Sequence, residues 1–247
     1  MRRPGWFLVV ALVATFFGAT AQAANSLLYS WEGSLEGWTA ANATLVNATG
    51  FGNTHGAQSM LLDNLTGGFK NDVGVATVGS GSPYLAWGDA GTRIAAGDTD
   101  VKLEFDLTFD NGSASAAFAQ LAIFVNSTSG NFKQYGTGGF IGGNIGSSFP
   151  SLDPAAVTDG VTMTGAGNTR HIAIPLGPTK SLTVGAPSGG SFYQVGFKSN
   201  GGWTGNVDWA IDNMYVSGAN IGIPEPTSIA LVALGMSALL MGRRRSA

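Results

Sequence analysis

The sequence predicts an all-β fold, an antiparallel β-sandwich, and three observations predict it. Residues 101–109 alternate apolar and polar side chains without interruption over nine positions, which is the period of a strand with one face in a core. Glycine accounts for 38 of the 247 residues and clusters between short apolar runs, as tight turns between strands require. No apolar stretch between the two ends of the chain has a convincing helical period. Short strands joined by glycine-rich turns are typical of a sandwich.

The strand at 101–109 buries one side through Leu103, Phe105 and Leu107, while Glu104 and Asp106 occupy the other side. Residues 117–125 follow after an Asp-Asn-Gly turn, so the two stretches are predicted to form an antiparallel hairpin. Further strands are predicted at residues 26–31, 43–46, 59–62, 170–174, 191–197 and 207–216.

The N-terminus has the composition of a secretory signal peptide. Arg2 and Arg3 precede an apolar run at residues 6–17, and the small residues Ala21 and Ala23 follow at the spacing of a cleavage site. We therefore expect a signal peptide at residues 1–23, cleaved after Ala23. The apolar run is too short to remain as a membrane anchor.

The C-terminus contains three features in order: a Pro-Glu-Pro motif, an uncharged segment and a cluster of arginines. After the predicted sandwich domain (24–217) and a spacer (218–223) come Pro224, Glu225 and Pro226, whose prolines favour extended backbone. Residues 227–242 carry no charge and predict a transmembrane helix of about 24 Å, slightly shorter than the ~30 Å hydrocarbon core. The terminal cluster is expected to stay cytoplasmic, which places the domain outside the membrane. That cluster comprises Arg243, Arg244 and Arg245.

This tripartite segment, residues 224–247, resembles the PEP-CTERM sorting signal of Gram-negative bacteria. The resemblance implies an exosortase as partner, which cuts at the Pro-Glu-Pro site. The protein would be anchored in the inner membrane for a time, and would then reach the cell surface or the extracellular matrix. The alternative is an ordinary tail anchor, which needs only the apolar segment and the arginines.

Charge and cysteine content exclude several classes of protein. The chain has 12 basic and 15 acidic residues, of which five arginines and Glu225 lie in the targeting segments. The predicted domain thus keeps 7 basic and 14 acidic residues, a net charge of −7. An acidic domain repels phosphate backbones, so we expect no nucleic-acid partner. The absence of cysteine excludes disulfides, a cysteine nucleophile and a lipid-modified cysteine.

Short motifs at both ends of the domain resemble jelly-roll carbohydrate-binding modules. Residues 29–38 resemble their opening strand and turn, residues 52–62 the next loop and strand, and residues 207–216 the closing strand. The resemblance implies that the first and last strands are adjacent. It also implies a structural calcium ion held by Glu32, Asp212 and carbonyls of residues 52–56, with Asp208 as a weaker substitute for Asp212. The alternative is that Glu32 faces solvent and Asp212 forms a turn.

No arrangement of residues predicts catalysis. Glu104 and Asp106 have the spacing of a β-sandwich glucanase motif, but its third position is Phe109, which cannot donate a proton. His55 and His171 are far apart in sequence and lie in no metal-ligand spacing. We expect a protein that is not an enzyme.

Aromatic residues are the remaining candidates for ligand binding. Trp38 and Trp209 lie in strand-like stretches and are expected in the core. Tyr84, Trp87 and Trp203 lie in glycine-rich stretches interpreted as loops, where an exposed ring can stack on a sugar. The alternative is that these rings fold over the end of the sandwich.

The sequence as a whole predicts an exported, exosortase-processed surface or matrix protein. Its domain is predicted to be a non-catalytic, jelly-roll-like sandwich that binds carbohydrate, with an exopolysaccharide as partner. Two alternatives stay open: a purely structural surface or biofilm protein without a ligand, and a polysaccharide-active enzyme.

Overall fold

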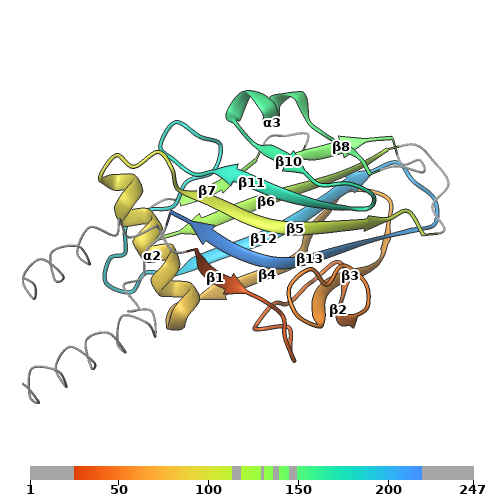
Figure 1. Ribbon diagram of the computed structural model, residues 1–247, viewed down its shortest axis with the longest axis horizontal. Coiled ribbons are helices and arrows are strands. Elements are labelled where there is room, and N and C mark those ends of the chain that lie inside the picture. The colour runs from red at the N-terminus through yellow and green to blue at the C-terminus, as the bar shows by residue number, and fades with distance from the viewer. Residues whose placement is uncertain (1–24, 113–117, 129–130, 136–138, 145–148, 219–247) are drawn as a thin grey trace, which may run out of the picture.

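Two antiparallel β-sheets pack face to face in the computed structural model (Figure 1). The structure describes residues 25–112, 118–128, 131–135, 139–144 and 149–218. The predicted signal peptide and the sorting segment with its predicted membrane span at 227–242 lie outside this range. Neither described helix is long and apolar enough to cross a membrane.

Sheet A lies toward the viewer in Figure 1 and has the order β10-β11-β5-β13-β3-β2, with β1 also paired to β13. Its strands are β1 (Ser26–Tyr29), β2 (Thr44–Thr49), β3 (Gln58–Thr66), β5 (Lys102–Asp110), β10 (Thr162–Thr164), β11 (Thr169–Pro175) and β13 (Asn206–Ser217). The first and last strands pair, with Ser26 opposite Val216, as expected.

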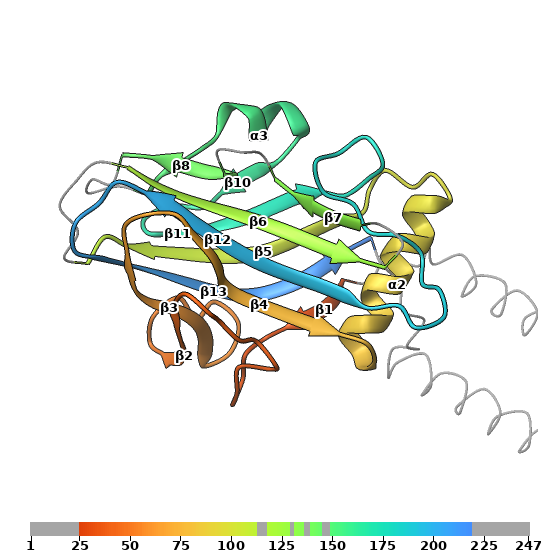
Figure 2. The same cartoon turned by 180° about the vertical axis from the view of Figure 1, so that it is seen from behind.

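Sheet B lies toward the viewer in Figure 2 and has the order β4-β12-β6-β8-β9, with β7 also paired to β6. Its strands are β4 (Lys70–Val78), β6 (Ala119–Ser127), β7 (Asn131–Gln134), β8 (Ile141–Gly143), β9 (Ser151–Leu152) and β12 (Tyr193–Gly201). The antiparallel sandwich that the sequence predicts is therefore observed.

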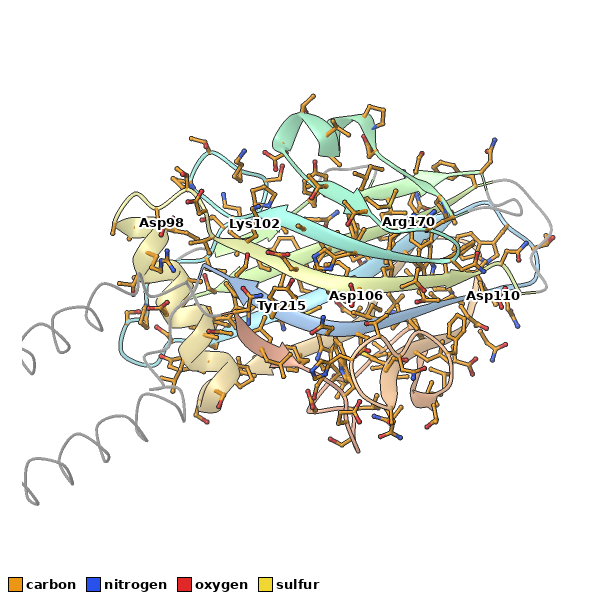
Figure 3. The ribbon with its side chains drawn as sticks, viewed as in Figure 1. Asp98, Lys102, Asp106, Asp110, Arg170 and Tyr215 are labelled. Atoms are coloured by element: carbon orange, nitrogen blue, oxygen red, sulfur yellow. The ribbon has the colours of Figure 1, made fainter. Side chains whose placement is uncertain are left out.

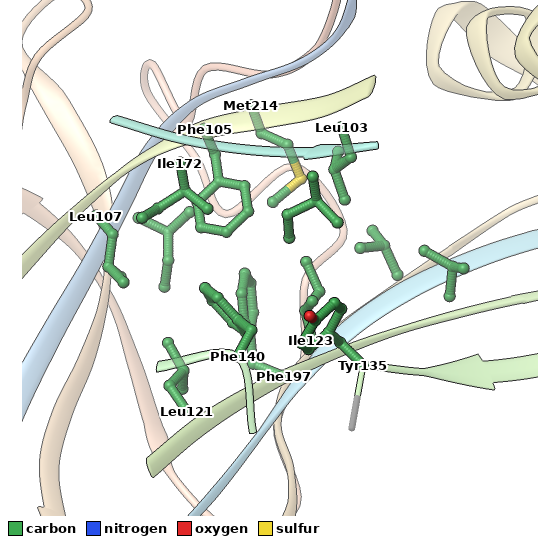
Figure 4. Close-up of a cluster of buried hydrophobic side chains, with 14 of the residues drawn as sticks. Leu103, Phe105, Leu107, Leu121, Ile123, Tyr135, Phe140, Ile172, Phe197 and Met214 are labelled. Carbon is green, nitrogen blue, oxygen red and sulfur yellow. The ribbon is translucent and has the colours of Figure 1, made fainter. Parts of the chain in front are cut away.

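The core lies between the two sheets. Phe105 of β5 and Phe197 of β12 meet edge to face, with ring centroids 5.7 Å apart, and Phe140 meets Phe105 at 6.0 Å (Figure 4). Each fully buried ring of this kind stabilises the fold by about 1.5–3 kcal/mol. Residues 101–109 therefore alternate for the predicted reason, which is that one side of β5 is buried in the core.

The predicted hairpin between residues 101–109 and 117–125 is wrong. The turn forms, since Asp110 accepts a hydrogen bond from the Gly112 N–H at 2.9 Å. However, β11 and β13 occupy both edges of β5, and β6 pairs with β12, β7 and β8 in the opposite sheet. The connection thus crosses from one sheet to the other.

The expectation that the domain has no helix is also wrong. Helix α2 (Gly81–Ala95) crosses one end of the sandwich, and α3 (Pro154–Asp159) lies along its side (Figure 1). The buried face of α2 includes glycines as well as larger side chains. A Cβ on Gly91 would lie 2.1 Å from the Gly185 oxygen, so the helix packs directly against backbone. Helix α3 begins with Asp153, whose carboxylate accepts the Ala155 N–H, and ends at Gly160 in the left-handed region.

Candidate functional site

The outer face of sheet B presents polar and aromatic side chains on strands whose inner faces build the core. On β6, Leu121, Ile123 and Val125 are buried between the sheets. The intervening residues of β6 lie opposite alternate residues of β12, so that both sets share the outer face. The outward pairs are Gln120 with Asn200, Ala122 with Lys198, Phe124 with Gly196, and Asn126 with Gln194.

Two phenylalanines form an aromatic platform on this face. The rings of Phe124 and Phe132 stack, with centroids 5.3 Å apart and planes inclined by 30°. Phe124 lies close over β12 because residue 196 is glycine, where a Cβ would meet the ring at 2.4 Å. The Lys198 ammonium lies over both rings, 4.9 Å from the Phe132 centroid and 5.5 Å from that of Phe124.

Two phenylalanine rings at this face are exposed, and so are available to a ligand. Phe132 is 48% exposed, and Phe69, just before β4, is 63% exposed. A large exposed ring is costly in water and offers a flat apolar surface to the C–H face of a sugar.

Amide side chains surround the rings. Asn200 Nδ2 donates to Gln120 Oε1 at 3.0 Å, and Gln194 Nε2 donates to Thr77 Oγ1 at 2.9 Å. Each amide keeps further donor and acceptor capacity beyond these bonds. A small hollow of about 50 Å³ lies among Phe69, Gln120, Gln134, Lys198 and Asn200. This hollow is too small to enclose a sugar ring.

A second hollow, of about 340 Å³, lies between β1, the turn at residues 30–36 and the start of α2. Its walls are mainly apolar. Glu36, the carboxylate that lines it, accepts hydrogen bonds from the N–H and hydroxyl of Ser30 at 3.0 and 3.1 Å. This carboxylate is therefore already used within the protein.

The outer face of sheet A holds a network of ionisable groups around His171, and two of its members, Asp106 and Tyr215, are labelled in Figure 3. His171 Nε2 lies 2.9 Å from Glu104 Oε2, and its Nδ1 lies 2.8 Å from Asp106 Oδ1. The Tyr215 hydroxyl donates to Glu104 at 3.0 Å, and its ring stacks on His171 with centroids 6.2 Å apart.

The two carboxylates raise the pKa of His171 by hydrogen bonding and charge, more than burial lowers it. Hydrogen bonds from Ser217, His171 and Tyr215 lower the pKa of Glu104, although burial alone would raise it. Both nitrogens of His171 therefore face acceptors, and the imidazolium form satisfies both. The network links the three neighbouring strands β11, β5 and β13.

In the structure, Glu32 and Asp212 both lie beside the loop at residues 51–58. Their carboxylates accept hydrogen bonds from N–H groups of that loop. Asp212 is fully buried, and its Oδ2 accepts the N–H groups of Thr54 and His55 at 2.6 and 2.7 Å. Glu32 Oε1 accepts the N–H groups of Ala57 and Gln58 at 2.8 and 3.0 Å. Burial raises the pKa of Asp212, and these hydrogen bonds oppose that rise.

This arrangement does not fit the calcium site expected at Glu32 and Asp212. Calcium needs six to eight oxygen ligands, and the loop presents hydrogen-bond donors to these carboxylates. Asp208, the weaker substitute, accepts the Asn64 N–H at 2.8 Å. Within the described ranges no three His, Asp or Glu side chains are placed to hold a metal ion.

The tryptophans predicted to stack on sugar are in the core. Trp87 lies in α2, not in a loop, and is 1% exposed. Trp203 is 5% exposed, and its Nε1 donates to the Leu65 oxygen at 3.0 Å. Tyr84 lies in α2 and packs against Tyr193, with centroids 5.3 Å apart. The prediction that Trp87 and Trp203 present exposed rings is therefore wrong, because both rings fill space between elements. Trp38 and Trp209 are buried, as expected.

The rings and the lysine of sheet B were not among the candidates predicted from the sequence, which were tryptophans and a tyrosine. The available signal was the alternation within 120–126 and 194–200, where four amides, Lys198 and the covered ring of Phe124 share one face with Ala122 and Gly196. An aromatic residue among polar ones on an outward face is the feature that marks such a surface.

No protein-family model matches the sequence, and no curated protein is detectably similar to it. Solved structures with similar arrangements include a xylan-binding domain of carbohydrate-binding module family 22 from Paenibacillus barcinonensis (13% identity, TM-score 0.38). It is matched over 81% of this chain and 97% of its own. A second family 22 module, from Clostridium thermocellum, has 12% identity and a TM-score of 0.39, with the same two coverages.

A third similar structure is the family 11 module from Clostridium thermocellum, which is in complex with a β-1,3-1,4-mixed-linked tetrasaccharide. It has 15% identity and a TM-score of 0.38, over 81% of this chain and 99% of its own. These structural neighbours are carbohydrate-binding modules. At such low similarity, the functional inference for this chain rests on its own residues.

Proposed function

We propose that this protein binds a polysaccharide without acting on it, through the outer face of sheet B. The observation that carries the proposal is the pair of exposed phenylalanines, Phe69 and Phe132, beside amide side chains on adjacent strands. Rings supply stacking surface for pyranose C–H groups, and amides supply paired donors and acceptors for hydroxyls. Glu104, Asp106 and Asp212 on sheet A already accept hydrogen bonds within the protein, from His171 and from loop N–H groups.

Binding is expected to be weak. Each ring contributes about 0.5–1.5 kcal/mol beyond the area it buries, and the amides must exchange hydrogen bonds with water. A dissociation constant on the order of 0.1–1 mM follows, or about 4–5 kcal/mol. Many copies on one surface would compensate through avidity.

The test uses the full-length chain purified in detergent, with xylan, mixed-linked β-glucan and polygalacturonate as immobilised probes. Phe69→Ala and Phe132→Ala should each weaken binding about tenfold, because each loses roughly 1.4 kcal/mol of contact. Leu85→Ala is the matched control, since Leu85 is 60% exposed on α2, the helix that crosses one end of the sandwich. It should bind like the parent.

If the two phenylalanine variants bind like the parent, the outer face of sheet B is not the site. If the parent binds none of the three probes at millimolar concentration of sugar, the alternative of a structural surface protein without a ligand is favoured.

We propose in addition that the domain is exported and then released from the inner membrane by an exosortase. The support is the order Pro224-Glu225-Pro226, uncharged segment and terminal arginines in the sequence. Glu225→Ala should leave uncleaved protein in the inner membrane, with its C-terminus cytoplasmic. Asp100→Ala, an exposed acidic position of the domain, is the control. Equal release of Glu225→Ala and parent would instead indicate an ordinary tail anchor.

A further inference from the structure

The charged residues of the two sheets are distributed unequally. The strands of sheet A carry six carboxylates against two basic residues and His171. The strands of sheet B carry one carboxylate against three lysines. The residues on sheet A are Asp63, Glu104, Asp106, Asp110, Asp208, Asp212, Lys102 and Arg170; those on sheet B are Asp72, Lys70, Lys133 and Lys198. A domain that is acidic as a whole therefore has one face from which carboxylates are nearly absent.

Lys198 is central to that face. Its ammonium lies over the rings of Phe124 and Phe132, and it borders the hollow between Gln120 and Asn200. None of the ion pairs among the described residues includes Lys198. The internal segments outside that range, 113–117, 129–130, 136–138 and 145–148, contain no Asp or Glu that could pair with it. Its charge is thus offset within the protein by the ring faces and by water.

We propose that the polysaccharide bound by this face is acidic, carrying sugar carboxylates of the uronic acid type. This inference rests on the proposed function and names the class of its ligand. One monosaccharide unit would stack on Phe132, while its carboxylate pairs with the Lys198 ammonium and its hydroxyls bond to the neighbouring amides.

Charge decides between an acidic and a neutral polymer. A charge-assisted hydrogen bond is about twice as strong as a neutral one. A neutral chain laid over Lys198 would remove water from the ammonium without supplying a counter-charge, which is unfavourable. The reverse holds on sheet A, where five of the six carboxylates are at least partly exposed and would repel an acidic polymer. An acidic polysaccharide is therefore directed to sheet B and repelled from sheet A.

The experiment compares each polymer with its own neutral form. The full-length chain in detergent is bound to polygalacturonate and alginate, and to the same polymers after reduction of their carboxyl groups. The parent should bind the acidic forms at least tenfold more tightly, and 0.5 M salt should remove most of the difference because it screens the charge. Lys198→Gln should abolish the preference, and Lys198→Arg should retain it.

Lys102→Gln is the matched control, because Lys102 is an exposed lysine on sheet A. It should behave like the parent. Melting curves identify any variant that fails to fold, and Lys198→Arg then still tests the role of the charge.

Each other outcome separates this inference from the proposed function. If the parent binds acidic and reduced polymers equally, or Lys198→Gln keeps the preference, the ligand class is wrong while polysaccharide binding stands. Binding of single-stranded DNA as tight as that of polygalacturonate would indicate a general response to polyanions and would also overturn the inference. If no acidic or neutral polysaccharide binds, the proposed function fails together with it.

Discussion

Replacing Asp212 with alanine tests how loop 51–58 is held to sheet A. The Asp212 carboxylate accepts the N–H groups of Thr54 and His55, and its other oxygen accepts the Asn213 N–H at 2.7 Å. A hydrogen bond to a charged group contributes about 1.5–3 kcal/mol, and the lower value applies because Thr54 and His55 have exposed sides that water reaches. Losing the two bonds to the loop should therefore cost about 3 kcal/mol. In a domain of this size that lowers the melting temperature by roughly 6–12 °C.

The assay is thermal unfolding of the full-length chain, with hydrogen exchange of the Thr54 and His55 amides. Asp212→Asn, which keeps an acceptor oxygen, should lose less than half as much stability. The control is Asp208→Ala on the same strand, which loses one bond, to Asn64, and should shift the melting temperature by only a few degrees.

The reasoning is refuted if Asp212→Ala melts within 2 °C of the parent and both amides stay protected. A chelator should leave the parent's melting curve unchanged, because hydrogen-bond donors already occupy the carboxylate. A fall as large as that of Asp212→Ala would instead support the calcium ion expected from the sequence.

Three further predictions concern the scaffold. Because the pKa of His171 is raised in the folded protein, its stabilisation is complete below its unfolded pKa and is lost as pH rises through the folded value. Stability should fall as pH rises above the unfolded pKa of about 6.5, with a slope of at most about 1.4 kcal/mol per pH unit. His171→Gln should flatten that slope, and a parent whose melting temperature does not fall as pH rises above about 6.5 contradicts the network. Trp203→Ala should cost about 3–5 kcal/mol in chemical unfolding, since it removes a buried ring and a bond to Leu65, and a loss below 1 kcal/mol would mean that the ring is not core. Gly91→Ala should cost about 1–3 kcal/mol because its Cβ would meet the Gly185 oxygen, whereas Gly79→Ala, with open space around it, should change the melting temperature little.

The fold class was predictable because a strand with one side buried and the other side in water has alternating apolar and polar residues, and this alternation is visible in the sequence. Residues 101–109 alternate since β5 has the core on one side and the His171 network on the other. The six additional strand positions predicted also fall within observed strands, with ends displaced by a few residues. Strand positions are a local property of the sequence, which is why the pattern is sufficient.

Strand partners and the main helix were not predictable in the same way. The Asp110 turn is real, but the neighbours of β5 are two strands far along the chain, and only packing of the whole domain selects them. Helix α2 was missed because its buried face is partly glycine and alanine, residues that carry little periodic signal. Gly91 is disfavoured in a helix by propensity, yet the helix needs it to approach the backbone of Gly185.

The candidate site was not predicted from the sequence for a related reason, since the packing of the whole domain decides which side chains stay exposed. Acidic residues are common calcium ligands, and the carboxylate oxygens of Glu32 and Asp212 do point at the loop that was predicted to complete the calcium site. The structure shows that those oxygens are filled by loop N–H groups, which no motif reveals. Trp87 and Trp203 were favoured because they lie in glycine-rich stretches interpreted as loops, but a large ring also gains the most from burial.

What distinguishes the two outer faces is how far their polar groups are satisfied within the protein. On sheet A the loop at 51–58 covers part of the surface, and its N–H groups occupy the buried carboxylate of Asp212. His171 similarly occupies Glu104 and Asp106. A ligand there would have to displace bonds that hold strands together. On sheet B the rings stack and the amides pair, but Phe132 is half exposed and the Lys198 ammonium faces ring surfaces in place of an anion. A ligand could therefore add contacts on sheet B without breaking the fold, and the Lys198 ammonium, which the ion pairs of the described residues do not include, is the basis of the proposed preference for an anionic sugar.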